Sequence, residues 1–311
     1  MLTMRTESAL GNMGEHPACN RLLSVGEAFL SGVLLEAGTH PKPGLVTPRS
    51  NGAHNDMTHM TFMVGSAAIS QAFYCCADAG FTHTADFPTL LPTLRTIGKS
   101  FEKHLLNKTK NVNTQRGALF LGGLLSGVSG KLFQTTESST LSHLDVCAGL
   151  STMCEGLVER ELSSLEENVE RKETAGEQLY KRYGARGVRG EVEDGLPSII
   201  NAGMPALVNA LDNGLSLNDA FAHTLISLLT MVEDTTILWR RGPDFLKSAQ
   251  QAAQSALSQG GMLTEAGRNT VRQMDMKFSA DNFSPGGCAD LLAMTIALYL
   301  LEKGNFPRKI M

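Results

Sequence analysis

The hydrophobic positions of this chain recur at the spacing of an α-helix. Within residues 20–38 they follow one another at intervals of three and four, at Leu22, Val25, Phe29 and Val33. Gly38 then provides a helix stop. Similar patterns predict helices over residues 57–79, 87–106, 115–133, 139–162, 166–183, 197–211, 217–240, 243–258, 262–278 and 286–303. No stretch alternates β-branched residues as a strand does, so the pattern predicts an all-α protein of about ten or eleven helices.

These helices are expected to form a single domain. We place it over residues 19–311, after a flexible N-terminal tail over residues 1–18. Only 6 % of the residues are aromatic whereas 31 are glycine, which favours closely approaching helices and a core rich in Leu, Met and Ala. Residues 155–177 carry charge on most faces and are interpreted as a solvated helical hairpin rather than a partner-binding arm.

Charge and cysteine content narrow the class of protein. The 27 basic and 31 acidic residues give a net charge of −4, which argues against a general nucleic-acid binder. The start of the chain has no apolar stretch of signal-peptide length, and Asp290 interrupts the longest apolar run, so we expect neither export nor membrane insertion. The six cysteines show no paired framework or zinc spacing, which indicates reduced residues in a cytoplasmic protein.

Four polar loops interrupt the helical pattern, over residues 39–57, 111–118, 183–195 and 283–290. Prolines stiffen the first loop around Lys42, and Arg116 opens a predicted helix, where a cation is unfavourable unless an anion lies beside it. The glycine-rich third loop carries Arg186 and Arg189 among three carboxylates, a composition that suits a phosphate with a divalent cation. Helix capping and solvent exposure remain open as simpler interpretations of all four loops.

Acidic residues within apolar helical patterns are a second indication of a site. Glu36 continues the apolar stripe of its helix, and Glu233 and Asp234 interrupt an apolar run that ends in Arg240 and Arg241. An unpaired buried charge costs several kcal/mol, so these carboxylates require a metal ion or a cationic partner. A structural ion pair is one interpretation, and a Mg²⁺-nucleotide site is the other. The chain has no Walker or dinucleotide-binding glycine motif, so a nucleotide would be held by helix ends and side chains.

Several ordered motifs over residues 24–303 resemble the triphosphoribosyl-dephospho-coenzyme A synthase family. They are Glu36 before Pro-Lys-Pro-Gly-Leu-Val (41–46), Gly-Ala-His-x-Asp-Met (52–57), Val-Asn-Thr-x-x-Gly-Ala (112–118), Arg-Gly-Glu (189–191), Asp-Thr (234–235), Arg-Gly (241–242) and Ser-Pro-Gly-Gly-x-Ala-Asp-Leu-Leu-Ala (284–293). The chain departs from the family pattern at Thr47, Gln115, Arg116 and Thr236, where the family usually has Asp, His, Lys and Asn.

The resemblance implies that ATP and 3′-dephospho-coenzyme A react to give 2′-(5″-triphosphoribosyl)-3′-dephospho-coenzyme A and adenine. The triphosphate is gripped and not cleaved, and the phosphate contacts implied here are Lys42, Arg116, Arg186, Arg189 and Arg241. The ligands implied for Mg²⁺ are Glu36, Asp56, Glu191 and Asp234. The base and acid of the glycosidic displacement are sought among His54, Asp56 and Glu191, with the assignment left open.

The product would be the prosthetic-group precursor of the acyl carrier protein of citrate lyase or malonate decarboxylase, loaded by a separate transferase. The sequence leaves two alternatives to this transferase function open. One is a Mg²⁺-dependent N-glycosidic nucleotide hydrolase, which would use the same nucleotide site with water as acceptor. The other is an inactive helical module that binds a carrier protein, suggested by the departures at Gln115 and Thr236. The sequence leaves open whether the chain forms a homodimer.

Overall fold

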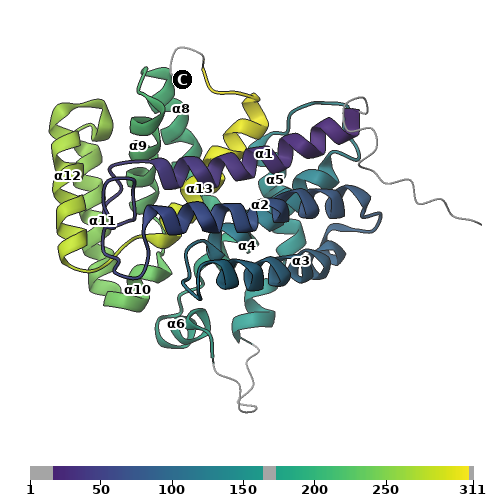
Figure 1. The fold of residues 1–311 in the computed structure, drawn as a ribbon, viewed down its shortest axis with the longest axis horizontal. Helices are drawn as coiled ribbons and strands as arrows, with labels where there is room; N and C mark the ends of the chain where they lie inside the picture. The colour runs from purple at the N-terminus through teal and green to yellow at the C-terminus, as the bar shows by residue number, and fades with distance from the viewer. Residues whose placement is uncertain (1–16, 164–172, 308–311) are drawn as a thin grey trace, which may run out of the picture.

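The fold was analysed in a computed structural model that describes residues 17–163 and 173–307. These residues form thirteen α-helices and no β-sheet, which confirms the all-α prediction for the described part of the chain (Figure 1). The helices are α1 (Pro17–Gly38), α2 (His59–Thr82), α3 (Phe87–Lys108), α4 (Arg116–Leu132), α5 (His143–Cys154), α6 (Ala175–Tyr183), α7 (Gly187–Glu193), α8 (Met204–Asp212), α9 (Leu217–Leu229), α10 (Thr235–Arg241), α11 (Pro243–Ser258), α12 (Glu265–Ala280) and α13 (Gly286–Lys303). Short π-helical turns (Glu159–Ser163, Ile199–Gly203) and a 3₁₀ turn (Gly261–Leu263) supplement them.

The helix count exceeds the predicted ten or eleven for two local reasons. The predicted helix over residues 217–240 is two helices, because the chain leaves helical geometry after Leu229 and Asp234 caps a new helix, α10. The glycine-rich segment over residues 183–195, interpreted from sequence as a loop, contains the short helix α7. Seven residues are too few to show a clear apolar period, so the sequence pattern missed α7.

The core is built around α1, α2, α4 and α13. In Figure 1, α1 and α2 run side by side across the molecule, α13 passes behind them, and α11 and α12 flank one end. Glycines let α2 and α4 approach closely, as the composition predicted. A Cβ on Gly80 would lie 1.8 Å from the carbonyl oxygen of Gly127, and one on Gly130 would lie 2.0 Å from that of Ala77. This packing brings the N-terminal ends of α4 and α13 together, where the polar loops meet.

One helix among the described residues, α2, has the length and apolar character of a membrane span. It packs against α1, α3 and α4, and nine of its residues are buried, which is the environment of a core helix. All six cysteines are free thiols. The predicted tail lies mostly outside the described residues, with α1 already beginning at Pro17. The predicted charged hairpin over residues 155–177 is only partly described, because residues 164–172 lie outside the described part.

Candidate active site

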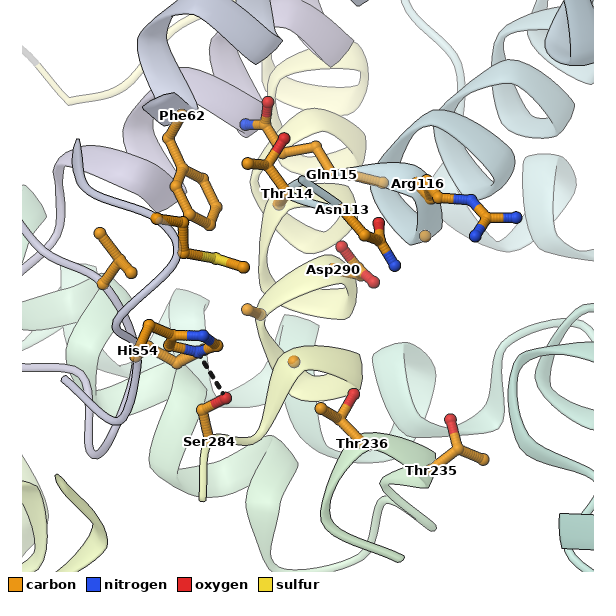
Figure 2. A pocket seen from close by; sticks show the side chains of 18 of the residues that line it. His54, Phe62, Asn113, Thr114, Gln115, Arg116, Thr235, Thr236, Ser284 and Asp290 are labelled. Atoms are coloured by element: carbon orange, nitrogen blue, oxygen red, sulfur yellow. Dashed lines mark hydrogen bonds between the residues drawn. The ribbon is translucent and has the colours of Figure 1, made fainter. Parts of the chain in front are cut away.

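A cavity of about 440 Å³ opens where three of the four predicted polar loops converge, those over residues 39–57, 111–118 and 283–290. Its walls come from the C-terminal end of α1, the loop after it, and the N-terminal ends of α2, α4, α6, α10 and α13. Figure 2 shows His54 and Ser284 on one side of this cavity, Asp290 at its centre, and Thr235 and Thr236 at a further edge. The site therefore collects segments that are more than two hundred residues apart in sequence.

The wall beside α1 holds a buried ion pair. Glu36 lies in the last turns of α1, and the Nζ of Lys42, in the loop that follows, contacts its carboxylate oxygen. Both side chains are almost completely buried, with exposed fractions of 6 % and 1 %. Each charge therefore has the partner that its burial requires. The inward orientation predicted for Glu36 from the helical period is confirmed.

A second group centres on His54. Its Nε2 lies 2.9 Å from the Ser284 hydroxyl, while its Nδ1 lies 3.7 Å from a carboxylate oxygen of Asp56 and 3.4 Å from the guanidinium of Arg240. Burial is the main cause that lowers the pKa of His54, and the positive charge of Arg240 lowers it further. Since the imidazole stays neutral at neutral pH, it can accept a proton.

Asp290 is a third titratable group in the cavity, and its partly buried carboxyl lies near the N-terminal end of α13. Burial raises its pKa well above the usual range, and the neighbouring charges of Glu36 and Asp234 act in the same direction. The carboxyl also packs directly on α4, where a Cβ added to Gly117 would lie 1.9 Å from Oδ2 of Asp290. A raised pKa favours the protonated carboxyl, which is the form that can donate a proton.

The start of α4 forms the opposite wall. The amide of Gln115 is buried and donates to the Ser66 hydroxyl on α2 over 2.9 Å, so it is not available as a helix cap. The Oγ1 of Thr114 is buried in the lining and has no hydrogen-bond partner among the described residues. In Figure 2 the side chain of Arg116 extends away from His54 and Ser284, and its guanidinium pairs with Glu102 on α3.

Five of the residues predicted from sequence line this cavity, namely Glu36, Lys42, His54, Asp56 and Arg116. The other five, Arg186, Arg189, Glu191, Asp234 and Arg241, do not. For these residues the structure shows contacts within the protein, which are described next.

Asp234 is used to join two helices. It does not lie inside a helix, as the sequence pattern suggested, but at the N-cap of α10, where it accepts hydrogen bonds from the backbone N–H groups of Thr236 and Ile237. It accepts a third, over 2.9 Å, from the N–H of Cys288 in α13. Burial raises the pKa of its fully buried carboxyl. Asp234 thus fixes the position of α10 against α13, behind the cavity wall.

The residues around α7 are paired with one another. Glu191 is bonded to the Ser198 hydroxyl and backbone, and burial raises its pKa. Arg186 forms a two-bond contact with Asp194, at 2.8 and 3.0 Å. The basic and acidic side chains of this segment thus neutralise one another, which is an alternative to binding a phosphate. Arg189 pairs with Glu161 over 2.8 Å and lines a neighbouring cavity.

Arg241 lies at the end of α10, where its guanidinium stacks on the Phe245 ring at 4.1 Å from the centroid. The preceding residue, Arg240, is the one that reaches the cavity lining. A helical rotation of about 100° separates neighbouring side chains, so only one of these two arginines can face the site. The sequence analysis named Arg241 as the phosphate contact, whereas the neighbouring Arg240 is the arginine that lines the cavity.

Sequence reasoning missed several lining residues. Asp290 and Ser284 lie within the quoted 284–293 motif, yet Asp290 was noted only as an interruption of an apolar run and Ser284 only as a helix cap. The useful signal is a carboxylate inside an otherwise apolar helix, since such a group is buried at a cost. Nothing in the sequence pattern marked Trp239, which is 53 % exposed at the edge of the cavity.

The described residues contain no group of three or more His, Cys, Asp or Glu side chains close enough to hold a metal ion. Of the four carboxylates implied for Mg²⁺, Glu36 and Asp56 line the cavity, whereas Glu191 and Asp234 do not. Mg²⁺ in nucleotide sites commonly uses one or two carboxylates together with phosphate oxygens and water. The cavity lining therefore fits an ion that enters with a triphosphate better than an ion held by protein alone.

Comparison with known proteins agrees with this geometry. The profile of the CitG family, described as ATP:dephospho-CoA triphosphoribosyl transferase, matches residues 23–308. A probable 2-(5″-triphosphoribosyl)-3′-dephosphocoenzyme-A synthase of Malonomonas rubra is 44 % identical, over 92 % of this chain and 90 % of its own length. The synthase of Pectobacterium atrosepticum is 37 % identical over 89 % of each chain. No solved structure matches the chain significantly. The chain therefore belongs to the ATP:dephospho-CoA triphosphoribosyl transferase family, a family of transferase enzymes.

Proposed function

We propose that this protein transfers the 5-triphosphoribosyl group of ATP to the ribose 2′-hydroxyl of 3′-dephospho-coenzyme A and releases adenine. In this reaction the bond from the anomeric carbon to adenine breaks, and a bond from that carbon to the acceptor oxygen forms. The acceptor hydroxyl loses a proton and adenine gains one. The observation that carries the proposal is the presence, in one cavity, of a neutral His54 and a partly buried Asp290 carboxyl that can hold a proton.

The proton transfers are assigned from these two environments. His54 accepts the proton of the acceptor hydroxyl, and the Ser284 hydroxyl 2.9 Å away orients its ring. Asp290 donates a proton to the departing adenine, since its raised pKa favours the protonated carboxyl.

The triphosphate would be held by helix ends and cations. The N-terminal ends of α4 and α13 face the cavity, and their backbone dipoles favour an anion there. Arg240 and Lys42 in the lining supply positive charge. Each charge-assisted hydrogen bond to phosphate contributes about 1.5–3 kcal/mol. The reaction takes place at the anomeric carbon and needs no nucleophile at phosphorus. These contacts therefore bind the triphosphate and leave it intact.

Magnesium is proposed as the partner of the triphosphate. Glu36 and Asp56 are the lining carboxylates that would contact it, directly or through water. When bound, the ion neutralises part of the phosphate charge. The protein residues then have fewer negative charges to balance, and two of the basic side chains in the cavity lining, Lys42 and Arg116, are already paired with Glu36 and Glu102.

The test is to mix purified protein with ATP, Mg²⁺ and 3′-dephospho-coenzyme A. Adenine release that requires the acceptor, together with a product of the mass of the two joined groups, is the expected result. Adenine release without the acceptor would instead identify an N-glycosidic hydrolase. If no adenine appears under either condition, the proposed reaction is wrong.

We propose that the product serves as prosthetic-group precursor for the acyl carrier protein of citrate lyase or malonate decarboxylase, in the cytoplasm. Support comes from the family resemblance, which links the reaction to both carriers. Deleting the coding region should leave the carrier without its prosthetic group, and the mass of the purified carrier would show this. A fully modified carrier in the deletion strain would contradict the assignment.

A further inference from the structure

A second cavity, of about 330 Å³, adjoins the first. It lies between α3 and α4 and is closed by the π-helical turn over residues 159–163 and by α7. The two cavities share Asn113, Arg116 and Gly117 in their linings. The start of α4 therefore forms a common boundary, with a separate hollow on each side of it.

The second cavity combines an apolar floor with a basic rim. The floor is formed by Leu94, Leu119, Phe120, Leu124 and Val188. The charged lining residues are four cations and two carboxylates, for a net charge of 4 − 2 = +2, namely Arg95, Lys99, Arg116, Arg189, Glu102 and Glu161. The first cavity, in contrast, contains the groups assigned to proton transfer.

The three arginine side chains of the rim are held in place before any ligand binds. Glu161 pairs with both Arg95 and Arg189, and Glu102 pairs with Arg116. The Nε of Arg95 is buried and has no hydrogen-bond partner among the described residues. A donor of this kind is costly to leave unpaired, which favours an acceptor group from a ligand. Figure 2 shows the side chain of Arg116 leaving the first cavity, on the side away from His54.

We propose that the second cavity binds the diphosphate and the pantetheine arm of the acceptor, 3′-dephospho-coenzyme A. This inference rests on the proposed function, which requires two nucleotides at once. The acceptor is a nucleoside diphosphate with a long, weakly polar amide arm, so it matches a basic rim followed by an apolar floor. Its ribose then lies at the boundary formed by Asn113, Arg116 and Gly117, where the 2′-hydroxyl can reach the first cavity.

Gly98 on α3 offers a direct test. It lines the second cavity only, and a Cβ there would meet no atom within 4 Å. Leucine is also a better helix former than glycine, so Gly98→Leu should fold normally while filling the cavity. We expect the KM for dephospho-coenzyme A to rise by about tenfold or more, which is a loss of about 1.4 kcal/mol, with the KM for ATP unchanged.

A charge test uses two lysines one helical turn apart on α3. Lys99 lines the second cavity, whereas Lys103 is exposed outside both cavities. Lys99→Gln should raise the KM for the acceptor by a few-fold, because the variant loses one solvent-screened contact between the ammonium and the acceptor. The increase in KM should become smaller as salt is added. Lys103→Gln makes the same change in net charge and should leave both KM values unchanged.

Direct binding separates this inference from the proposed function. Calorimetry should show dephospho-coenzyme A binding to the wild-type protein, and binding at least about tenfold weaker to Gly98→Leu. That pattern supports the acceptor site even if no adenine is released, in which case only the proposed reaction fails. If Gly98→Leu binds the acceptor as tightly as the wild type, or if the wild type does not bind it, the second cavity is not the acceptor site.

Discussion

Two titratable groups of the first cavity have their pKa values moved in directions that suit proton transfer. Burial and Arg240 lower the pKa of His54, whereas burial and nearby carboxylates raise that of Asp290. The shift at His54 favours the neutral imidazole, which can accept a proton, and the shift at Asp290 favours the protonated carboxyl, which can give one. The same physical cause, loss of water, thus yields a base from an imidazole and an acid from a carboxyl.

The shift at His54 predicts a pH profile. Because its pKa lies below the ordinary value of 6.5, the imidazole is neutral at pH 7 and loses its ability to accept a proton only as pH falls through the lowered pKa. We therefore expect kcat/KM to stay level through neutrality and to fall on the acidic side. His54→Gln should lower kcat by about 10²–10⁴-fold and remove that acidic limb, as pH-rate measurements would show. An unchanged profile in the variant would assign the base elsewhere.

Trp239 provides a signal for nucleotide binding. It is the single tryptophan of the chain, it is 53 % exposed, and it lies at the edge of the first cavity. Adding ATP with Mg²⁺ should change the intrinsic fluorescence in a saturable way, because the nucleotide alters the water around the indole. Dephospho-coenzyme A alone should change it less, if the acceptor arm lies in the second cavity. The Trp239→Phe protein controls for the weaker tyrosine emission.

At the scale of helices, sequence predicted most of the framework and part of the site. The inward direction of Glu36 followed from the 3.6-residue period, which is a local property. The break before α10 did not, because the apolar pattern continues through it and only the capping contacts of Asp234 reveal it. The pairing of Arg186 with Asp194 depends on the conformation of α7, so the sequence left solvent pairing and ligand binding equally open.

The contact between α4 and α13 predicts that Gly117 tolerates no side chain. A Cβ there would lie 1.9 Å from Oδ2 of Asp290, whose carboxyl packs directly on the start of α4. Gly117→Ala should destabilise the protein by about 1–3 kcal/mol and abolish most activity, since the carboxyl or the helix must move. Gly98→Ala is the matched control. It replaces another helical glycine, where a Cβ meets no atom within 4 Å, and should be neutral or stabilising by about 0.5–1 kcal/mol in urea unfolding.

The cap at Asp234 predicts a large structural effect. Asp234→Ala removes the acceptor for three backbone N–H groups, from α10 and α13, and should destabilise the fold by about 2–4 kcal/mol. Ser216→Ala is a control, because Ser216 caps α9 through a single bond to the N–H of Asp219 and its loss should cost about 1 kcal/mol. If both variants lose the same free energy of unfolding in denaturant titrations, the hydrogen bond that links α10 to α13 contributes little to stability.

At the scale of the molecule, ligand binding should stabilise the whole fold. The first cavity draws on α1, α2, α4, α6, α10 and α13, so a nucleotide that bridges them binds the folded chain and not the unfolded one. At 100 times its Kd, ATP with Mg²⁺ should add about 2.7 kcal/mol and raise Tm accordingly. Chelating the metal should remove most of this shift if Mg²⁺ enters with the triphosphate. A Tm that is unaffected by ATP would argue against a nucleotide site in this cavity.

The first cavity is lined by residues from helices near both ends of the chain, so it can form only after the whole chain has been translated. Glu36 is translated early, whereas Asp290 emerges near the end and reaches its place only when α13 packs against α1. A nascent or truncated polypeptide lacking α13 has neither the proton donor nor the wall that encloses it. We therefore expect an incomplete chain that ends before α13 to lack a complete first cavity and to bind no nucleotide there.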